Sequence, residues 1–123
     1  MNGNSIFLDT NIILYLISGD QSLAELLSNK TIYISFISEL ELLGFKDLDS
    51  DEKQRIEELL ESITIIDINA EIKKLTTSLR KNYKIKLPDA IIVATSYFLN
   101  LPLMTSDKQI SKISEVNILQ YEK

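Results

Sequence analysis

A chain of 123 residues that contains neither histidine nor cysteine has few side chains with which to do chemistry. The lack of cysteine excludes disulfides, thiol nucleophiles and zinc–thiolate sites, and the lack of histidine excludes the serine triad and the commonest transition-metal ligand. Carboxylates, hydroxyls, amides and lysines remain, and the oxygen ligands among these suit magnesium, manganese or calcium. The net charge of −5 argues against a passive nucleic-acid-binding module, which would be basic, but it permits an enzyme that places metal ions between its carboxylates and a phosphate.

Length and hydropathy predict one soluble, cytoplasmic domain that comprises residues 1–123. A chain of this size buries roughly two thirds of its unfolded surface, which is enough for an ordinary core. The apolar run Ile12–Ile17 is far too short to cross a membrane, and no segment resembles a signal peptide.

The first half of the chain alternates short apolar runs, which suit strands, with segments that suit helices. A strand over Ile6–Leu8 leads into a helix over Ile12–Ile17 that is apolar on nearly every side, which indicates burial on two faces. Asp20 is placed to cap a short helix, and Thr31–Phe36 is rich in strand-forming residues. Ser38–Glu41 has the spacing of a capping box, which predicts that the next helix begins there.

The second half continues the same alternation and completes an α/β pattern. Pro88 suits the first position of a helix, and the almost wholly apolar stretch Ala90–Leu99 predicts that this helix is the most buried one. The other expected elements are a helix from Ser50, a strand over Ile63–Asp67, a helix capped by Asn69 and ending at Asn82, a strand over Leu103–Thr105 and an edge strand over Val116–Leu119. Such alternation predicts a three-layer α/β/α sandwich with a central, mostly parallel sheet.

Four acidic residues lie where an apolar element begins or ends. Asp9 follows the first strand, Glu41 lies in the first turn of the helix after the second strand, Asp89 opens the buried helix, and Asp107 follows a late strand. In a parallel sheet these points lie at one edge, so the four carboxylates can converge. Their mutual repulsion is relieved by a divalent cation, so we expect one or two Mg²⁺ or Mn²⁺ ions and attack of an activated water on a phosphodiester.

Each acid also has a purely structural interpretation. Asp89 complements the dipole of a helix N-terminus, Glu41 completes a capping box, and Asp107 suits a turn. Asp9 is the hardest to explain in this way, because strands seldom end in a carboxylate within so apolar a context. The four acids together support a catalytic role more strongly than any one of them.

The segments that carry these acids resemble those of a PIN domain and, within that family, of the VapC-type toxins of bacterial toxin–antitoxin pairs. The matching segments are Leu8–Asn11, Ile34–Leu42, Leu87–Thr95 and Thr105–Asp107, and the resemblance extends over nearly the whole chain. Asp-Thr-Asn alone is common, but the four segments in this order and spacing are specific.

The resemblance implies a metal-dependent ribonuclease with a Rossmann-like fold that uses Mg²⁺ or Mn²⁺, forms a homodimer and has a cognate antitoxin that occupies its site. By match, the acidic set is Asp9, Glu41, Asp89 and Asp107, and the polar residues that help to hold water, metal or Asp9 are Asn11 and Thr105. The family's middle glutamate lies three residues after a Ser or Thr at the helix start, which selects Glu41. If the helix begins elsewhere, Glu39 takes that role.

Two surface segments are candidates for binding partners. Basic residues concentrate just before Asp89, and they comprise Lys73, Lys74, Arg80, Lys81, Lys84 and Lys86. Arg80, Lys84 and Lys86 are candidates to guide an RNA backbone into the site, although a solvated helix face is the simpler explanation of these residues. The apolar helix Ile12–Ile17 is a candidate dimer or antitoxin surface, with core packing as the alternative.

Two other functions compete with a nuclease. A phospho-acceptor receiver domain is also α/β, and Asp67 would be its acceptor, but such a domain expects two adjacent acids after the first strand, where this chain has Thr10 and Asn11 after Asp9. A mass shift on Asp67 after incubation with acetyl phosphate would favour it. An inactive PIN-like scaffold is the other alternative, and the presence of all four acids argues against it.

Overall fold

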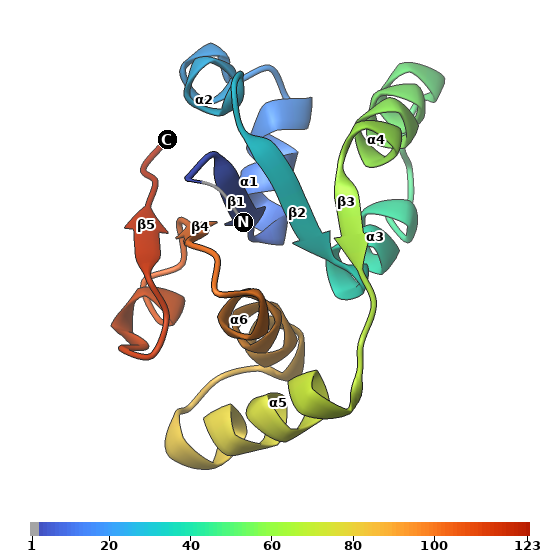
Figure 1. Ribbon diagram of the computed structural model, residues 1–123. Helices are drawn as coiled ribbons and strands as arrows, with labels where there is room; N and C mark the ends of the chain where they lie inside the picture. Colours follow the sequence, from blue (N-terminus) through green and yellow to red (C-terminus); the bar gives the residue numbers. More distant parts are fainter. Residues whose placement is uncertain (1–2) are drawn as a thin grey trace.

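A sheet of five parallel strands divides the molecule into two helical layers (Figure 1). The computed structural model describes residues 3–123. The strands are β1 (Ser5–Leu8), β2 (Thr31–Ser35), β3 (Thr64–Ile66), β4 (Leu103–Thr105) and β5 (Ile118–Gln120), in the order β3-β2-β1-β4-β5. The helices are α1 (Thr10–Ile17), α2 (Gln21–Leu27), α3 (Phe36–Leu43), α4 (Ser50–Ser62), α5 (Ala70–Asn82) and α6 (Leu87–Leu99), and a short 3-10 turn, η1, spans Ile110–Lys112. The predicted three-layer α/β architecture is therefore confirmed.

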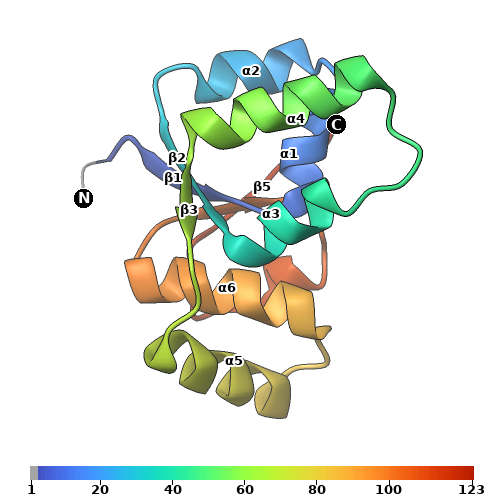
Figure 2. The same ribbon diagram turned by 90° about the vertical axis from the view of Figure 1, so that its right-hand side faces the viewer.

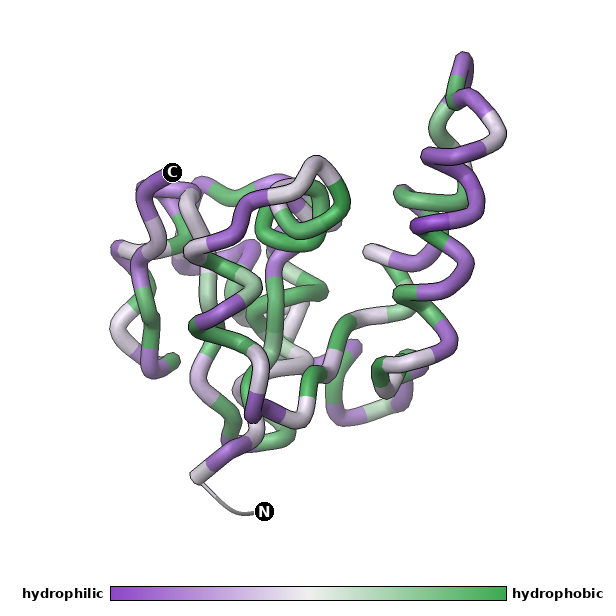
Figure 3. Tube along the Cα trace, turned by 90° about the horizontal axis from the view of Figure 1, so that it is seen from above, coloured by the Kyte–Doolittle hydropathy of each residue, from purple (hydrophilic) through white to green (hydrophobic). Residues whose placement is uncertain are grey.

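The alternation of side chains in β1 separates two hydrophobic cores. Ile6 and Leu8 face the layer of α1, α2, α3 and α4, whereas Phe7 faces α5 and α6. Figure 2 shows these two layers above and below the sheet. In the hydropathy view, α4 on the right-hand side alternates hydrophilic and hydrophobic residues, as expected of a helix whose only fully buried residue is Ile56 (Figure 3).

Helix α6 lies between the sheet and α5, and residues 90–96 are all buried. This confirms that the apolar stretch before Leu99 forms the most buried helix. The helix begins at Leu87, so Pro88 is its second residue instead of the predicted first, a position where a missing N–H is still tolerated. It ends at Leu99, and the capping residue that follows, Asn100, adopts the left-handed conformation with φ of 55°. Asp89 is thereby held in the first turn, at the carboxyl edge of the sheet.

The start of α3 differs from the prediction. The helix begins at Phe36, directly after β2, and Ser35 caps it by accepting a hydrogen bond from the Ile37 N–H at 3.1 Å. Ser38 therefore lies inside the helix, and the predicted capping box between Ser38 and Glu41 is wrong. The reason is that Ser35 reaches the first free N–H groups earlier in the chain, which leaves the side chain of Ser38 available for a tertiary contact.

Other element boundaries are confirmed or shifted slightly. Asp20 and Asn69 cap α2 and α5 as predicted, and α5 ends at Asn82. The edge strand β5 begins at Ile118, two residues later than predicted. Val116 is instead buried against the core of α5 and α6 and does not pair with β4. The turn η1 was not among the predicted elements.

Core packing accounts for the apolar character of α1. Ile12 and Ile13 are fully buried, and the remaining apolar residues of this helix pack partly against the same core. Asp20 lies shortly after the last residue of α1, and its carboxylate accepts a hydrogen bond from the Tyr121 hydroxyl at 2.7 Å. No helix within residues 3–123 has the length and apolar character needed to cross a membrane.

Two adjacent residues at the start of α4 provide a test of helix capping. Ser50 is the first helical residue, as predicted, but Asp49 is the cap, and it forms a capping box with Glu52. We expect Asp49→Ala to lower the thermal unfolding midpoint by a few degrees, because one N–H of the first turn loses its acceptor, and Ser50→Ala to leave it unchanged. Circular dichroism melts of both variants check this, and equal effects would contradict the assignment of Asp49 as the cap.

Candidate active site

Asp9 connects the end of β1 to the start of α1, where only 4% of its surface is exposed. Its Oδ1 accepts a hydrogen bond from the Thr10 N–H at 2.7 Å, and its Oδ2 accepts one from the Thr105 hydroxyl at 2.7 Å. Thr105 comes from the end of β4, the strand that pairs with β1. A donor on each oxygen fixes the orientation of this buried carboxylate and supports its charged form.

Asp107 is tied to the same hydrogen-bond chain. Its backbone N–H donates to the Thr105 hydroxyl oxygen at 3.0 Å, and its Oδ1 accepts from the Gln109 N–H at 2.7 Å. The predicted turn role of Asp107 is therefore present in the structure. Its charge nevertheless acts on the site, since it raises the pKa of both Asp9 and Asp89.

Glu41 lies on the face of α3 that looks toward the start of α1. The Thr10 hydroxyl donates to its Oε1 at 2.8 Å and lies 2.8 Å from the hydroxyl oxygen of Ser38. Because Thr10 has a single hydroxyl proton and gives it to Glu41, Ser38 must be the donor to Thr10. Thr10 thus orients two acids at once, Asp9 through its N–H and Glu41 through its side chain.

The structure also distinguishes the two neighbouring glutamates. Helix α3 begins at Phe36, the situation in which Glu39 was expected to take the site role. Glu41, however, is the glutamate on the pocket wall, whereas Glu39 lies two residues earlier on a different side of the helix and is not among the lining residues. The contacts of Ser38 and Glu41 with Thr10 explain which helix face is turned inward.

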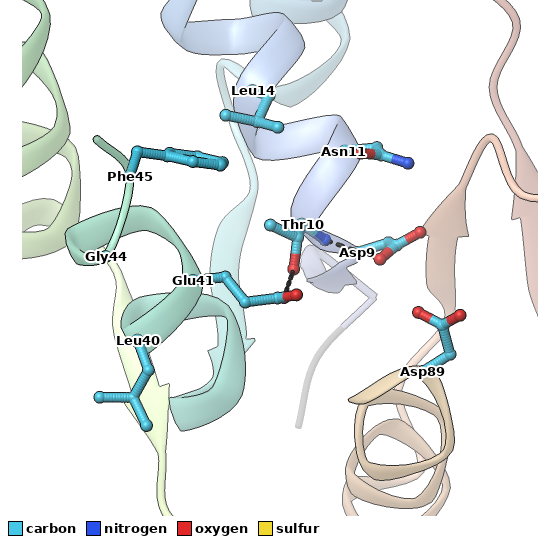
Figure 4. A pocket seen from close by; sticks show the side chains of 9 residues that line it. All are labelled: Asp9, Thr10, Asn11, Leu14, Leu40, Glu41, Gly44, Phe45 and Asp89. Carbon is cyan, nitrogen blue, oxygen red and sulfur yellow. Dashed lines mark hydrogen bonds between the residues drawn. The ribbon is translucent and has the colours of Figure 1, made fainter. Parts of the chain in front are cut away.

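These side chains surround a pocket with a cavity volume of about 580 Å³. Its lining residues are Asp9, Thr10, Asn11, Leu14, Leu40, Glu41, Gly44, Phe45 and Asp89. Figure 4 shows Asp9, Glu41 and Asp89 pointing into it from three different elements. The structure therefore brings three of the predicted acids, together with Asn11, to one pocket, and it leaves Asp107 just outside the wall.

Electrostatics at the pocket oppose full ionisation of the acids. Burial raises the pKa of Asp89 to about 6, with further contributions from the charges of Asp9, Asp107 and Glu41, while the charge of Lys86 opposes the shift. Burial also raises the pKa of Asp9, although its hydrogen bonds with Thr105 and Thr10 partly offset that effect. Added positive charge in the pocket would relieve this conflict.

The donor chemistry of the pocket fits a hard divalent cation. All the acidic ligands are carboxylates, which Mg²⁺ and Mn²⁺ prefer, and the Asn11 amide supplies another oxygen at the rim. Within the part of the chain that the structure describes, no three acidic side chains lie close enough to bind one ion together directly. This spacing suits Mg²⁺, which retains several of its waters and takes only one or two carboxylates as direct ligands.

Several pocket residues were not predicted. The Thr10 hydroxyl contacts both Glu41 and Ser38, and the spacing between Ser38 and Glu41 was a signal that was interpreted as a helix cap. Leu14, Leu40 and Phe45 line the opposite part of the pocket, and no local sequence pattern distinguishes them from ordinary core residues.

None of the predicted RNA contacts is among the residues that line the pocket. Arg80, Lys84 and Lys86 are exposed near the end of α5 and the start of α6, and Lys86 is close enough for its charge to lower the pKa of Asp89. Asp67, the acceptor in the receiver hypothesis, is exposed after β3. Its side chain accepts a hydrogen bond from the N–H of the next residue, Ile68, at 2.8 Å.

Comparisons with known proteins agree with this geometry. The family model of the PIN domain matches residues 6–116. A toxin–antitoxin complex from Klebsiella pneumoniae contains a chain with 33% sequence identity and a TM-score of 0.81, and the match covers 96% of this chain and 99% of that one. VapBC-1 from nontypeable Haemophilus influenzae has 26% identity and a TM-score of 0.82, with 94% and 97% of the two chains covered.

VapBC2 from Rickettsia felis, solved with a DNA fragment from its promoter, shares the fold at 24% identity and a TM-score of 0.79, over 96% of this chain and 99% of that one. No curated protein matches the chain. The family match removes the receiver-domain alternative, because it identifies residues 6–116, a range that includes all four acidic segments, as a PIN domain. Since the family model spans residues 6–116 and a relative of 33% identity aligns over nearly the whole chain, this protein belongs to the PIN-domain family, in agreement with the VapC-type resemblance of its motifs.

Proposed function

We propose that this PIN domain is a metal-dependent endoribonuclease, the toxin of a toxin–antitoxin pair, which hydrolyses RNA phosphodiester bonds with Mg²⁺ or Mn²⁺. The observation that carries the proposal is the convergence of Asp9, Glu41 and Asp89 from three elements on one pocket. The shift of the Asp89 pKa to about 6 adds support, because acids crowded in this way are typical of sites that hold a cation.

The residues of the pocket would divide the work of hydrolysis. When bound, a divalent ion supplies Lewis acidity at the phosphate. Asp9 and Asp89 would hold that ion, with Thr105 and the Thr10 N–H keeping Asp9 in position. Glu41, whose Oε1 is held by Thr10, would use its other oxygen to orient the attacking water and accept its proton.

Asp9 and Asp89, the two acids proposed to hold the ion, provide the principal test. We expect Asp9→Asn and Asp89→Asn each to reduce RNA cleavage by about 10³-fold, because the loss of one ligand removes several kcal/mol of charge stabilisation. Cleavage of labelled RNA with Mn²⁺ measures this, and either variant retaining wild-type activity would refute the proposed site.

The same Asp89→Asn protein tests whether Asp89 is functional or structural. A raised pKa means that ionised Asp89 destabilises the metal-free fold, a cost that is fully present above about pH 6 and disappears as the pH falls below the ordinary value of 3.8. The metal-free variant should therefore melt higher than wild type at pH 8, with little difference near pH 4. A lower melting temperature at pH 8 would show that Asp89 is a structural residue.

The neighbouring glutamates form a matched pair. Glu41→Gln should lower the turnover rate by about 100-fold, since an amide cannot accept the proton of the attacking water, whereas Glu39→Gln should stay within about twofold of wild type. Single-turnover cleavage at saturating RNA distinguishes the two. The opposite ranking would transfer the role to Glu39.

The basic residues before Asp89 are proposed to guide the RNA backbone. Phosphates approaching a pocket of carboxylates are repelled. Arg80, Lys84 and Lys86 are exposed in the segment that leads to Asp89, and the charge of Lys86 acts on that residue. Lys73 and Lys74 lie near the start of α5, whereas Arg80 lies near its end, next to the segment that leads to α6. Lys74 pairs with Glu71 at 3.9 Å.

This arrangement predicts a difference in salt dependence. Reversing the charge at Lys84 and Lys86 should reduce kcat/KM at low salt about tenfold and flatten its dependence on salt concentration, since fewer counterions are released on binding. The same reversal at Lys73 and Lys74 should leave the salt dependence unchanged. If the two double variants behave alike, net charge and not the position of these residues governs association.

The partners follow from the relatives, two of which were solved as VapBC complexes and one as a toxin–antitoxin complex. We propose that this protein likewise has a protein antitoxin that covers the acidic pocket, that it forms a homodimer, and that it acts on RNA in the cytoplasm. Co-purification of a small basic-tailed protein encoded beside it would support the first of these, since a cationic segment would neutralise the acids.

A further inference from the structure

The candidate pocket has two chemically different ends. Asp9 and Asp89 form one end, whereas Leu14 and Phe45 form the other, with Glu41 between them (Figure 4). An ion with six waters fills on the order of 200 Å³, at about 30 Å³ for each water. The cavity of about 580 Å³ therefore has room for part of a substrate beside the ion.

Phe45 is placed as a surface residue and not as part of the core. Its side chain is 41% exposed, and it also borders a second recess of about 250 Å³ next to α4. Gly44 ends α3 so tightly that a Cβ there would lie 2.9 Å from the Leu40 carbonyl oxygen. This close turn brings the Phe45 ring directly to the edge of the pocket.

We propose that Phe45 stacks on an unpaired nucleobase of the RNA next to the phosphate that is cleaved. The inference rests on the proposed function, because a phosphodiester held at the acids carries a nucleotide on each side. An apolar wall cannot bind the phosphates, but an aromatic ring in a single-stranded RNA site stacks well on bases. Leu14, which lies near the ring in Figure 4, extends the apolar surface.

The consequence is selection for single-stranded RNA. A base within a duplex is stacked on its neighbours and cannot reach a ring inside a pocket, so cleavage would require an unpaired nucleotide at the cut. Stacking also offsets the repulsion between the acids and the RNA backbone. Phe45 would thus contribute binding energy that the acidic end of the pocket cannot provide.

The test combines Phe45 variants with RNA that lacks single bases. After the cleaved bond is located in a single-stranded oligonucleotide with Mn²⁺ present, kcat/KM is measured for oligonucleotides with one abasic position on either side of that bond. Phe45→Ala should lower kcat/KM roughly 5- to 100-fold and Phe45→Tyr should not. Phe45→Leu, which retains an apolar side chain, should resemble Phe45→Ala. Leu43→Ala is the control, because Leu43, the last residue of α3 and two residues before Phe45, is 53% exposed but does not line this pocket.

Coupling between the ring and one base decides the outcome. At one abasic position, the kcat/KM of the wild type should fall by as much as the Phe45→Ala substitution lowers it on intact RNA. Combining Phe45→Ala with that abasic RNA should lower kcat/KM no further than either change alone. Additive losses at every position would overturn the inference while leaving the nuclease intact. Normal cleavage by Phe45→Ala, with loss of antitoxin binding, would also overturn it and assign the ring to the protein partner. A wild-type protein that cleaves no RNA would instead refute the proposed function itself.

Discussion

The hydrogen bonds to the Asp9 carboxylate hold the candidate site together. A buried carboxylate without donors would readily take up a proton, and at Asp9 the hydrogen bonds from the Thr10 N–H and the Thr105 hydroxyl partly offset the rise in pKa that burial causes. The first donor belongs to the first turn of α1, and the second belongs to the neighbouring strand β4. The pairing of β1 with β4 therefore positions one of the two donors that favour the charged form of Asp9, which makes the sheet topology part of the site's chemistry.

Thr10 extends this dependence to α3. The Thr10 hydroxyl accepts a hydrogen bond from Ser38 and donates one to Glu41. Glu41 is therefore the acceptor at the end of this series of hydrogen bonds. The three residues lie in two helices on the same face of the sheet. A small displacement of α3 would break these contacts, so packing of the apolar residue Leu42 against that core contributes indirectly to the orientation of Glu41.

Local sequence patterns predicted the fold well, and they predicted the site in part. Asp9 and Asp89 were recognised because each interrupts or opens an apolar run, and burial imposes those runs on any sequence with this architecture. Ser38 was misassigned because its partner, Thr10, is 28 residues away, and a capping pattern carries no information about such a contact. Phe45 had no local signal, since its exposure depends on where α3 ends relative to α1.

The crowding of acids around Asp89 also couples the binding of a cation to the release of a proton. With a pKa of about 6, this side chain carries a proton for part of the time near neutral pH when no cation is present. Binding of a divalent ion must then expel that proton, so ion uptake near pH 6 is an exchange whose measured heat depends on the buffer that receives the proton. In mildly acidic surroundings hydrogen ions and metal ions would compete for the same oxygen atoms.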